Sequence, residues 1–325
     1  MVRHRADRAG DRGGRLRVRR PPRHRPLPRA VDLIVEGRAR TAAVTGGLVP
    51  TSVRVPTSGL ALRCLVWGSE SDPTALLLHG NGGHAHWWDA LVPALVPGWR
   101  LVAPDLRGHG ESDWAEPPRY RLEDFARDLT SVHDALAPGR MVLVGHSMGG
   151  RVAAWYATAH PERVRGLVLL DSRMNRVRRK EAAGWRARVA GMRVGRGYAT
   201  RDQALAAFRF VPDEVAVSPA IVADLAHHAI VERGPGDWTF RFDRAVLSLE
   251  GDGAGDLFPR LGRLSCPVLV MAGAASWIMD AAQRDAMTAA IPDCALRVFP
   301  GGHHFLVAQP GPVGLALRVF LDGLD

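Results

Sequence analysis

A serine between glycines is the residue of this chain best placed to do chemistry. Ser147 stands in Gly-His-Ser-Met-Gly at 145–149, directly after the apolar run 141–144. A strand that ends in this pattern and leads into a helix turns so sharply that the serine hydroxyl is exposed at the top of a sheet, and small neighbours permit the bend. The segment 150–156 reads as that helix, whose N-terminus favours a developing oxyanion. The pattern therefore predicts that Ser147 is a nucleophile.

A second glycine-rich strand end is predicted to supply the other half of an oxyanion hole. The apolar run 75–78 is followed by His79, Gly80 and Asn81, and then by two more glycines. Such a strand exit can bring a backbone N–H close to a substrate carbonyl. We therefore expect the amides of Asn81 and Met148 to hold the oxyanion, with His79 and Gly80 beside them. The alternative is that the glycines only permit a tight turn.

The last loop of the chain carries two candidate general bases. A strand-like segment, 295–299, leads to Pro-Gly-Gly-His-His at 300–304, which places His303 and His304 on a loop. An unperturbed imidazole titrates near neutral pH, so either ring could take the serine proton and return it to a leaving group. A lone histidine is more often a surface or capping residue, but this position after the last strand favours a base.

These motifs resemble the α/β-hydrolase family over a region from about Thr51 to the end of the chain. The matching segments are 79–83, Pro-Asp-Leu-Arg-Gly-His-Gly-Glu-Ser at 104–112, 145–150, His-Pro-Glu-Arg-Val at 160–164, and 302–303. The resemblance implies an α/β fold: a mostly parallel eight-stranded sheet flanked by helices, with a helical lid inserted after the sixth strand, 166–170. It also implies that His303, which follows a glycine and stands seven residues before Pro310, is the base, with His304 as the alternative.

The acid that orients the base is less clearly marked. In most members of the resembled family it follows the strand after the lid, but here the strand 267–271 is followed by Ser276 where a carboxylate is expected. Some members carry the acid at the end of the sixth strand, so Asp171 is the preferred candidate, and the order Ser…Asp…His is kept. Asp280 is the alternative, although it precedes an alanine-rich helix and reads better as an N-cap. Either carboxylate would fix the imidazole tautomer and stabilise the imidazolium.

Length and charge divide the chain into parts. It has 325 residues and a net charge of +10, and residues 1–30 carry eleven arginines against two aspartates. We expect 1–30 to be a disordered tail, interpreted as an unstructured extension in preference to an arm for nucleic acid or an anionic membrane. Residues 31–171 and 265–325 are predicted to form one α/β core, and 172–264 a lid.

No segment predicts export or insertion into a membrane. No apolar run reaches the ~18–20 residues that cross a bilayer, and there is no secretory h-region, so we expect a cytoplasmic protein without a transmembrane segment. The three cysteines, Cys64, Cys266 and Cys294, are too few and too scattered for a disulfide framework. They read as small apolar residues.

The predicted lid begins with a basic helical stretch at 176–188. A second helix is expected to start at Thr200, with Gln203 placed for a capping box, and a third after Pro219. The segment 237–243 alternates and predicts a short strand or extended arm. A lid over a catalytic serine shapes the pocket and excludes water.

Aromatic residues near the predicted site favour an apolar or aromatic acyl group. Trp87 follows the oxyanion loop and Trp277 follows the strand 267–271, so both are candidates for the pocket wall, with core packing as the alternative for each.

We expect neither a metal nor another cofactor. Adjacent histidines such as His227 and His228 do not share a helical face, and no carboxylate cluster accompanies them. The group His79, His84 and His86 carries no better metal signature, because His79 belongs to the turn motif.

The predicted activity is hydrolysis of a small or medium-sized carboxylic ester, or a related acyl compound, through an acyl-enzyme on Ser147. A serine in place of an aspartate at this turn argues, in terms of the resembled family, against haloalkane dehalogenase and epoxide hydrolase chemistry. Three alternatives stay open. The same triad could cleave a carbon–carbon bond in a diketone-type substrate, or perform cofactor-free perhydrolysis, or the fold could serve as a non-catalytic or very slow receptor or scaffold.

Overall fold

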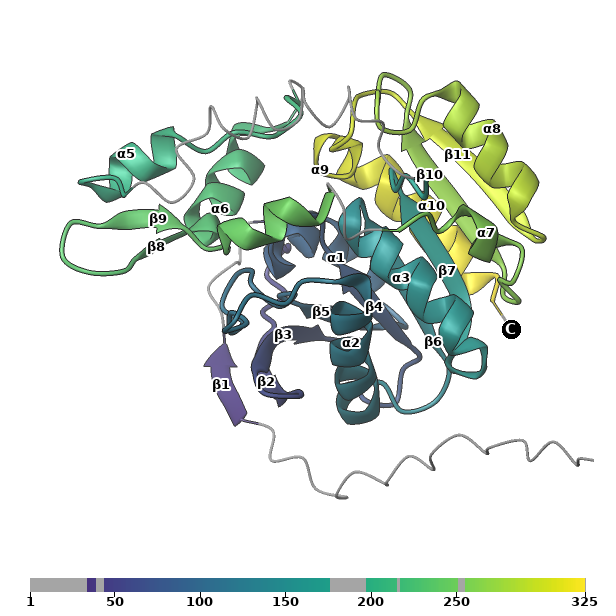
Figure 1. Ribbon diagram of the computed structural model, residues 1–325, viewed down its shortest axis with the longest axis horizontal. Helices are drawn as coiled ribbons and strands as arrows, with labels where there is room; N and C mark the ends of the chain where they lie inside the picture. Colours follow the sequence, from purple (N-terminus) through teal and green to yellow (C-terminus); the bar gives the residue numbers. More distant parts are fainter. Residues whose placement is uncertain (1–33, 39–43, 176–196, 215–216, 251–254, 325) are drawn as a thin grey trace, which may run out of the picture. The chain divides into compact units, whose positions relative to one another are not determined.

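The computed structural model describes residues 34–38, 44–175, 197–214, 217–250 and 255–324 (Figure 1). The predicted tail at 1–30 and the predicted basic helical stretch at 176–188 lie outside these residues. Within the described ranges no helix combines the length and the apolar character needed to cross a membrane.

One sheet carries the core. Among the described residues its strands lie in the order β1-β2-β3-β5-β4-β6-β7-β10-β11. Their bounds are β1 Ile34–Arg38, β2 Thr51–Pro56, β3 Ala61–Trp67, β4 Thr74–Leu78, β5 Arg100–Pro104, β6 Met141–His146, β7 Val164–Leu170, β10 Val268–Gly273 and β11 Cys294–Phe299. Pairing is parallel from β5 through to β11 and antiparallel among β1, β2, β3 and β5. The eight strands after β1 form the predicted mostly parallel sheet, and β1 adds a ninth at its antiparallel edge.

Helices cover both faces of this sheet, which is why its central strands are continuously apolar. Every residue of β6 is buried. Met141 and Leu143 belong to one apolar cluster and Val142 and Val144 to the other, because successive side chains of a strand point to opposite faces.

The helices divide between the two clusters. Residues of α2 Leu122–Leu136, α3 Met148–Ala159, α7 Phe258–Leu261 and α8 Ala281–Ala290 pack in the first. Residues of η1 Ala85–Leu91, α1 Val92–Leu95, α9 Phe305–Ala308 and α10 Pro310–Asp322 pack in the second, and η2 Pro161–Arg163 precedes β7. The apolar residues of α2 recur at helical spacing and are buried along its length. The result is a three-layered core that holds the strand ends rigidly.

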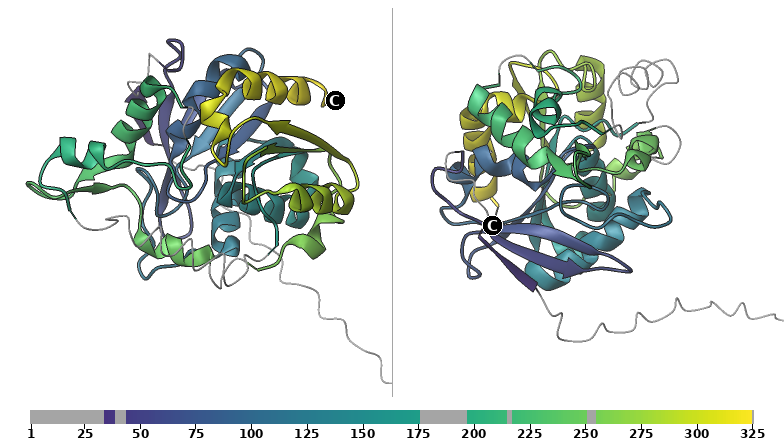
Figure 2. Two further views of the ribbon diagram at one scale, coloured as in Figure 1. Left: turned by 90° about the horizontal axis from the view of Figure 1, so that it is seen from above. Right: turned by 90° about the vertical axis from the view of Figure 1, so that its left-hand side faces the viewer.

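We call the described residues between β7 and β10 the cap. It contains α5 Arg201–Ala206, α6 Pro219–Ala229, β8 Ile230–Glu232, β9 Trp238–Phe240, η3 Arg244–Glu250 and α7. Thr200 is the N-cap of α5, and its hydroxyl accepts from the amide of Gln203 at 3.2 Å, which is one of the two bonds of the predicted capping box. β9 is the short strand predicted within 237–243, and it pairs with β8 in an antiparallel hairpin. In Figures 1 and 2, α5 and this hairpin extend away from the sheet, and α6 lies nearer to it.

Candidate active site

Ser147 lies in the sharp turn between β6 and α3. Its backbone has φ 53° and ψ −117°, a conformation that a residue with a side chain adopts only under strain. A Cβ on Gly149 would collide with the carbonyl of Leu78, and a Cβ on Gly145 would overlap the backbone of Gly150. The glycines of the motif are therefore required, and they allow the turn to present the serine side chain at the end of β6.

A hydrogen-bonded chain joins Ser147, His303 and Asp171. The Oγ of Ser147 lies 3.0 Å from Nε2 of His303, and Nδ1 of the same ring lies 2.7 Å from Oδ2 of Asp171. The side chains of His303 and Asp171 are 4% and 0% exposed. Because the carboxylate accepts the proton of Nδ1, the neutral ring has a lone pair on Nε2 that can accept the serine proton. This geometry can activate the hydroxyl as a nucleophile.

The carboxylate of Asp171 is held by two further donors. The amide of Gly273 donates to Oδ1 at 3.1 Å, and the hydroxyl of Ser276 donates to Oδ2 at 2.5 Å. Ser276 stands where the resembled family usually has its acid. In this chain its hydroxyl instead binds the carboxylate of Asp171, which follows β7. Sequence analysis missed this role; its one signal was a hydroxyl at the position of the expected acid.

The two alternatives for acid and base lie outside this chain of hydrogen bonds. Asp280 is exposed and is the N-cap of α8, where its side chain accepts from the amide of Gln283 at 2.8 Å. His304 is buried beside His303, and none of its ring nitrogens has a hydrogen-bond partner among the described residues. The geometry therefore favours Asp171 and His303.

Two backbone amides lie where an oxyanion could form. Met148 is the first residue of α3, so its N–H has no acceptor within the helix. Asn81 lies in a turn closed by a 3.0 Å bond from Gly83 N to Gly80 O, with Gly82 at φ 73°. This turn does not use the amide of Asn81. A Cβ on Gly80 would stand 3.2 Å from the Cβ of Ser147, so the turn lies against the nucleophile.

His79 supports that turn from beneath. Its Nε2 accepts from the amide of Leu106 at 2.9 Å, so its Nδ1 carries the proton and donates to Gly80 O at 2.8 Å. Burial lowers the pKa of the ring, which keeps it neutral. Since backbone groups engage both nitrogens, His79 positions the loop and offers no ring nitrogen to a substrate.

The two candidate pocket tryptophans differ in burial. Trp87 is 9% exposed and contacts the rings of His146, His304 and Phe210 of the cap, with centroid separations of 5.9, 5.2 and 5.8 Å. Trp277 is 37% exposed. An aromatic wall beside the catalytic histidine loop is therefore built by Trp87 and Phe210.

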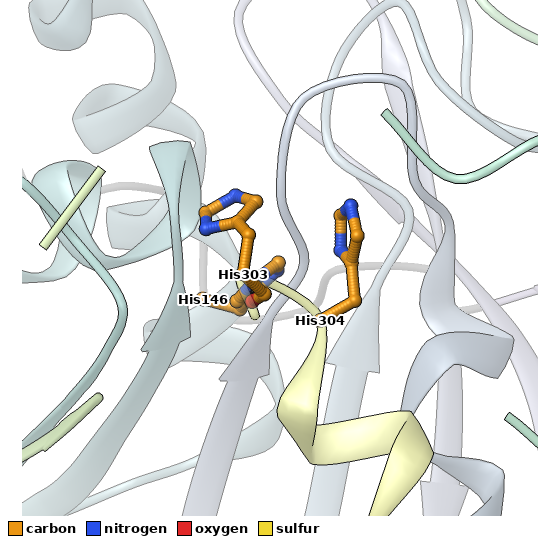
Figure 3. Close-up of side chains that lie close together, drawn as sticks. All are labelled: His146, His303 and His304. Atoms are coloured by element: carbon orange, nitrogen blue, oxygen red, sulfur yellow. Dashed lines mark hydrogen bonds between the residues drawn. The ribbon is translucent and has the colours of Figure 1, made fainter. Parts of the chain in front are cut away.

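Three buried histidines lie together at this place: His146, His303 and His304 (Figure 3). The Nε2 of His146 donates to the backbone carbonyl of His303 at 3.0 Å, which ties the end of β6 to the loop after β11. Burial holds the pKa of both His146 and His304 well below the usual histidine range, so both rings are neutral. Sequence analysis did not find this group, because His146 is separated from the other two by most of the cap and core.

A cap residue binds the backbone of the catalytic loop. The carboxylate of Glu214 accepts from the amide of Gly302 at 3.0 Å and from the amide of His304 at 3.2 Å. These amides flank His303, so Glu214 holds the segment that carries this histidine. No motif pointed to Glu214, since the contact spans 88 residues of sequence.

Comparison with known proteins places the chain in a family. Residues 73–219 match the α/β-hydrolase fold family. The chain is 32% identical over 256 residues to the esterase Rv0045c of Mycobacterium tuberculosis, covering 74% of this chain and 78% of that protein. It is 31% identical to a putative carbamate hydrolase, RutD, of Variovorax paradoxus, covering 81% of this chain and 96% of that protein. The chain belongs to the α/β-hydrolase fold family.

Solved structures agree with this assignment. The crystal structure of E-2-(acetamidomethylene)succinate hydrolase is 25% identical and superposes with a TM-score of 0.75, covering 84% of this chain and all of that one. The relatives that the chain resembles include an esterase, a putative carbamate hydrolase and a further hydrolase, which places it among the hydrolases of this fold.

Proposed function

We propose that this protein is a serine hydrolase that cleaves a small or medium-sized carboxylic ester, or a related acyl compound, through an acyl-enzyme. The observation that carries the proposal is the continuous hydrogen-bonded chain from Ser147 Oγ through His303 to Asp171, at a strained turn next to two available amides. The similarity to an esterase supports the reaction class, since the matched region includes the serine turn.

The reaction follows from this geometry. His303 Nε2 takes the hydroxyl proton as Ser147 attacks the carbonyl carbon, and Asp171 stabilises the imidazolium through Nδ1. The oxyanion accepts from the amides of Met148 and Asn81. His303 returns the proton to the leaving alcohol, and it then activates water to release the acid and regenerate Ser147.

Two assays test the proposal. A fluorophosphonate probe should label wild-type protein rapidly and leave Ser147→Ala unlabelled, because only an activated serine reacts quickly. A series of nitrophenyl esters of increasing acyl length should then be hydrolysed faster than a diketone substrate or a carboxylic acid with peroxide. Fast labelling with preference for the diketone or for peroxide would replace ester hydrolysis by one of those reactions. Absence of labelling in folded protein would favour a non-catalytic receptor or scaffold.

A further inference from the structure

The histidines beside the nucleophile are close enough to share a ligand. His146 comes from the end of β6, and His303 and His304 from the loop after β11 (Figure 3). Ring centroids lie 4.6 Å apart for His146 and His303, 4.8 Å for His303 and His304, and 5.6 Å for His146 and His304. Each ring offers a nitrogen within 4.8 Å of the nitrogens of the other two. Around a tetrahedral ion with zinc–nitrogen bonds of about 2.0–2.1 Å, such nitrogens would be about 3.3 Å apart, so the rings would have to bring their nitrogens closer by up to about 1.5 Å.

Two of the rings are already oriented as metal ligands usually are. His303 donates its Nδ1 proton to the carboxylate of Asp171, and His146 donates its Nε2 proton to the carbonyl of His303. Metal-binding histidines almost always donate their second N–H to a carboxylate or a backbone carbonyl in this way. The lone pair on Nδ1 of His146 remains unused, and the one on Nε2 of His303 faces the Ser147 hydroxyl at 3.0 Å, which an ion would displace.

Nitrogens in this group have no hydrogen-bond partner although they are buried. Among the described residues this applies to Nδ1 of His146 and to both ring nitrogens of His304. The backbone of Val211 lies beside the His304 ring and raises its pKa, although burial lowers it more, and neither ring nitrogen has a partner of ordinary hydrogen-bond geometry in the described part of the chain. A Cβ at position 80 would stand 2.9 Å from Nδ1 of His146, so Gly80 leaves that nitrogen uncovered. Buried polar atoms without partners point to a missing ligand.

We propose that His146, His303 and His304 bind a divalent transition-metal ion, best fitted by Zn²⁺, and that the bound ion inhibits the enzyme. Neutral imidazoles suit Zn²⁺, and three of them leave a fourth position for water or for Ser147 Oγ. The ion occupies the lone pair on His303 Nε2, so the ring can no longer accept the serine proton. The carboxylates of Asp171 and Glu214 accept hydrogen bonds from the loop that carries His303 and His304, and their negative charge favours a cation beside these histidines. Metal binding is independent of the proposed function, whereas inhibition rests on it.

Calorimetry and kinetics test the two parts separately. Chelator-treated full-length protein is titrated with Zn²⁺, and with Mg²⁺ as a hard-ion control, by isothermal titration calorimetry. Ester hydrolysis and fluorophosphonate labelling are then measured with increasing Zn²⁺ and again after excess EDTA. His304→Gln removes one ligand, and each variant is compared with its own metal-free rate. His228→Gln is the matched control, because His228 lies in a separate group of neighbouring histidines, where its ring stacks on that of His86.

We expect a single Zn²⁺ to bind and to inhibit over the same concentration range, with recovery in EDTA and no effect of Mg²⁺. His304→Gln should weaken both binding and inhibition by at least about 10–100-fold, and His228→Gln should change neither. The metal site is refuted by absence of binding, by binding that His304→Gln leaves unchanged, or by binding that His228→Gln abolishes. Binding at this site without inhibition refutes the inhibitory role. If metal-free protein neither hydrolyses esters nor reacts with the probe, the proposed function fails, while the calorimetry still decides the metal site.

Discussion

Replacing Asp171 by asparagine should invert the polarity of the catalytic imidazole. The amide of Gly273 can only donate, so the side-chain oxygen of an asparagine must stay at the position of Oδ1, 3.1 Å from that amide. Its NH₂ group then takes the position of Oδ2, facing Nδ1 of His303 at 2.7 Å and the hydroxyl of Ser276 at 2.5 Å. The hydroxyl already accepts from the amides of Ile278 and Met279 at 3.2 and 3.4 Å, so it has little capacity to accept another proton, and the imidazole must change tautomer.

The expected loss follows from that tautomer. With Nδ1 accepting from the amide, the ring proton moves to Nε2, which can no longer take the proton of Ser147. We expect kcat to fall about 10⁴-fold, which corresponds to ~5.4 kcal/mol of transition-state stabilisation. KM should change much less, because the substitution leaves the oxyanion amides and the aromatic wall in place.

The assay is steady-state hydrolysis of a short-chain nitrophenyl ester, together with the rate of fluorophosphonate labelling and the melting temperature. Asp280→Asn is the matched control: it makes the same chemical change at the N-cap of α8, where asparagine caps as well as aspartate, so kcat should stay within about twofold. If Asp171→Asn in folded protein keeps kcat within about tenfold of wild type, or if the control is the damaging variant, the assignment of Asp171 as the orienting acid is wrong.

Three further predictions follow from named contacts. Ser147→Ala and His303→Ala should each lower kcat by about four to six orders of magnitude without unfolding the protein; a larger loss for His304→Ala than for His303→Ala would move the base to the neighbouring ring. Glu214→Ala should lower kcat about tenfold, because it removes the oxygen that accepts from the amides of both Gly302 and His304, and losing such bonds costs ~1.4 kcal/mol; Asp213→Ala, at the exposed neighbour, is the control, and equal effects would show that the contact is unimportant. Burial lowers the pKa of His86 to about 3 and the pKa of His228 to about 2, from the ordinary histidine value of 6.5. Below pH 6.5 these two residues are therefore protonated in the unfolded chain but not in the folded one, so the unfolded chain binds more protons. The melting temperature should therefore fall between pH 7.5 and pH 5, and His228→Gln should make that fall smaller; an unchanged pH dependence in this variant would contradict the depressed pKa.

Local sequence was sufficient for the nucleophile. The glycines around Ser147 fix a turn that few other residues can adopt, and the apolar run before it and the helix after it are neighbours in sequence. Similarly, the apolar spacing of α2 and the hydroxyl of Thr200 determine where helices form, because capping and helical periodicity depend on residues three or four positions apart.

The sequence favoured Asp171 as the acid but left Asp280 open, because both carboxylates follow predicted strands. Only the register of β7 beside β10 brings Asp171 to Gly273 and Ser276, and the same pairing leaves Asp280 one loop further on, at the start of a helix. The choice depended on which strands became neighbours, and strand order is a property of the whole sheet.

The sequence by itself determined that the chain would form a mostly parallel sheet, with a sharp turn carrying Ser147 and a loop carrying His303 and His304. The tertiary structure decided what surrounds them: Glu214 reaches the loop from the cap, and His146 meets His303 and His304 from another strand. The physical reason is the range of the interactions. Turns, caps and periodic burial are set by residues close in the chain, whereas contacts between segments separated by 88 to 157 residues exist only once the sheet has been assembled and its helices have packed on it.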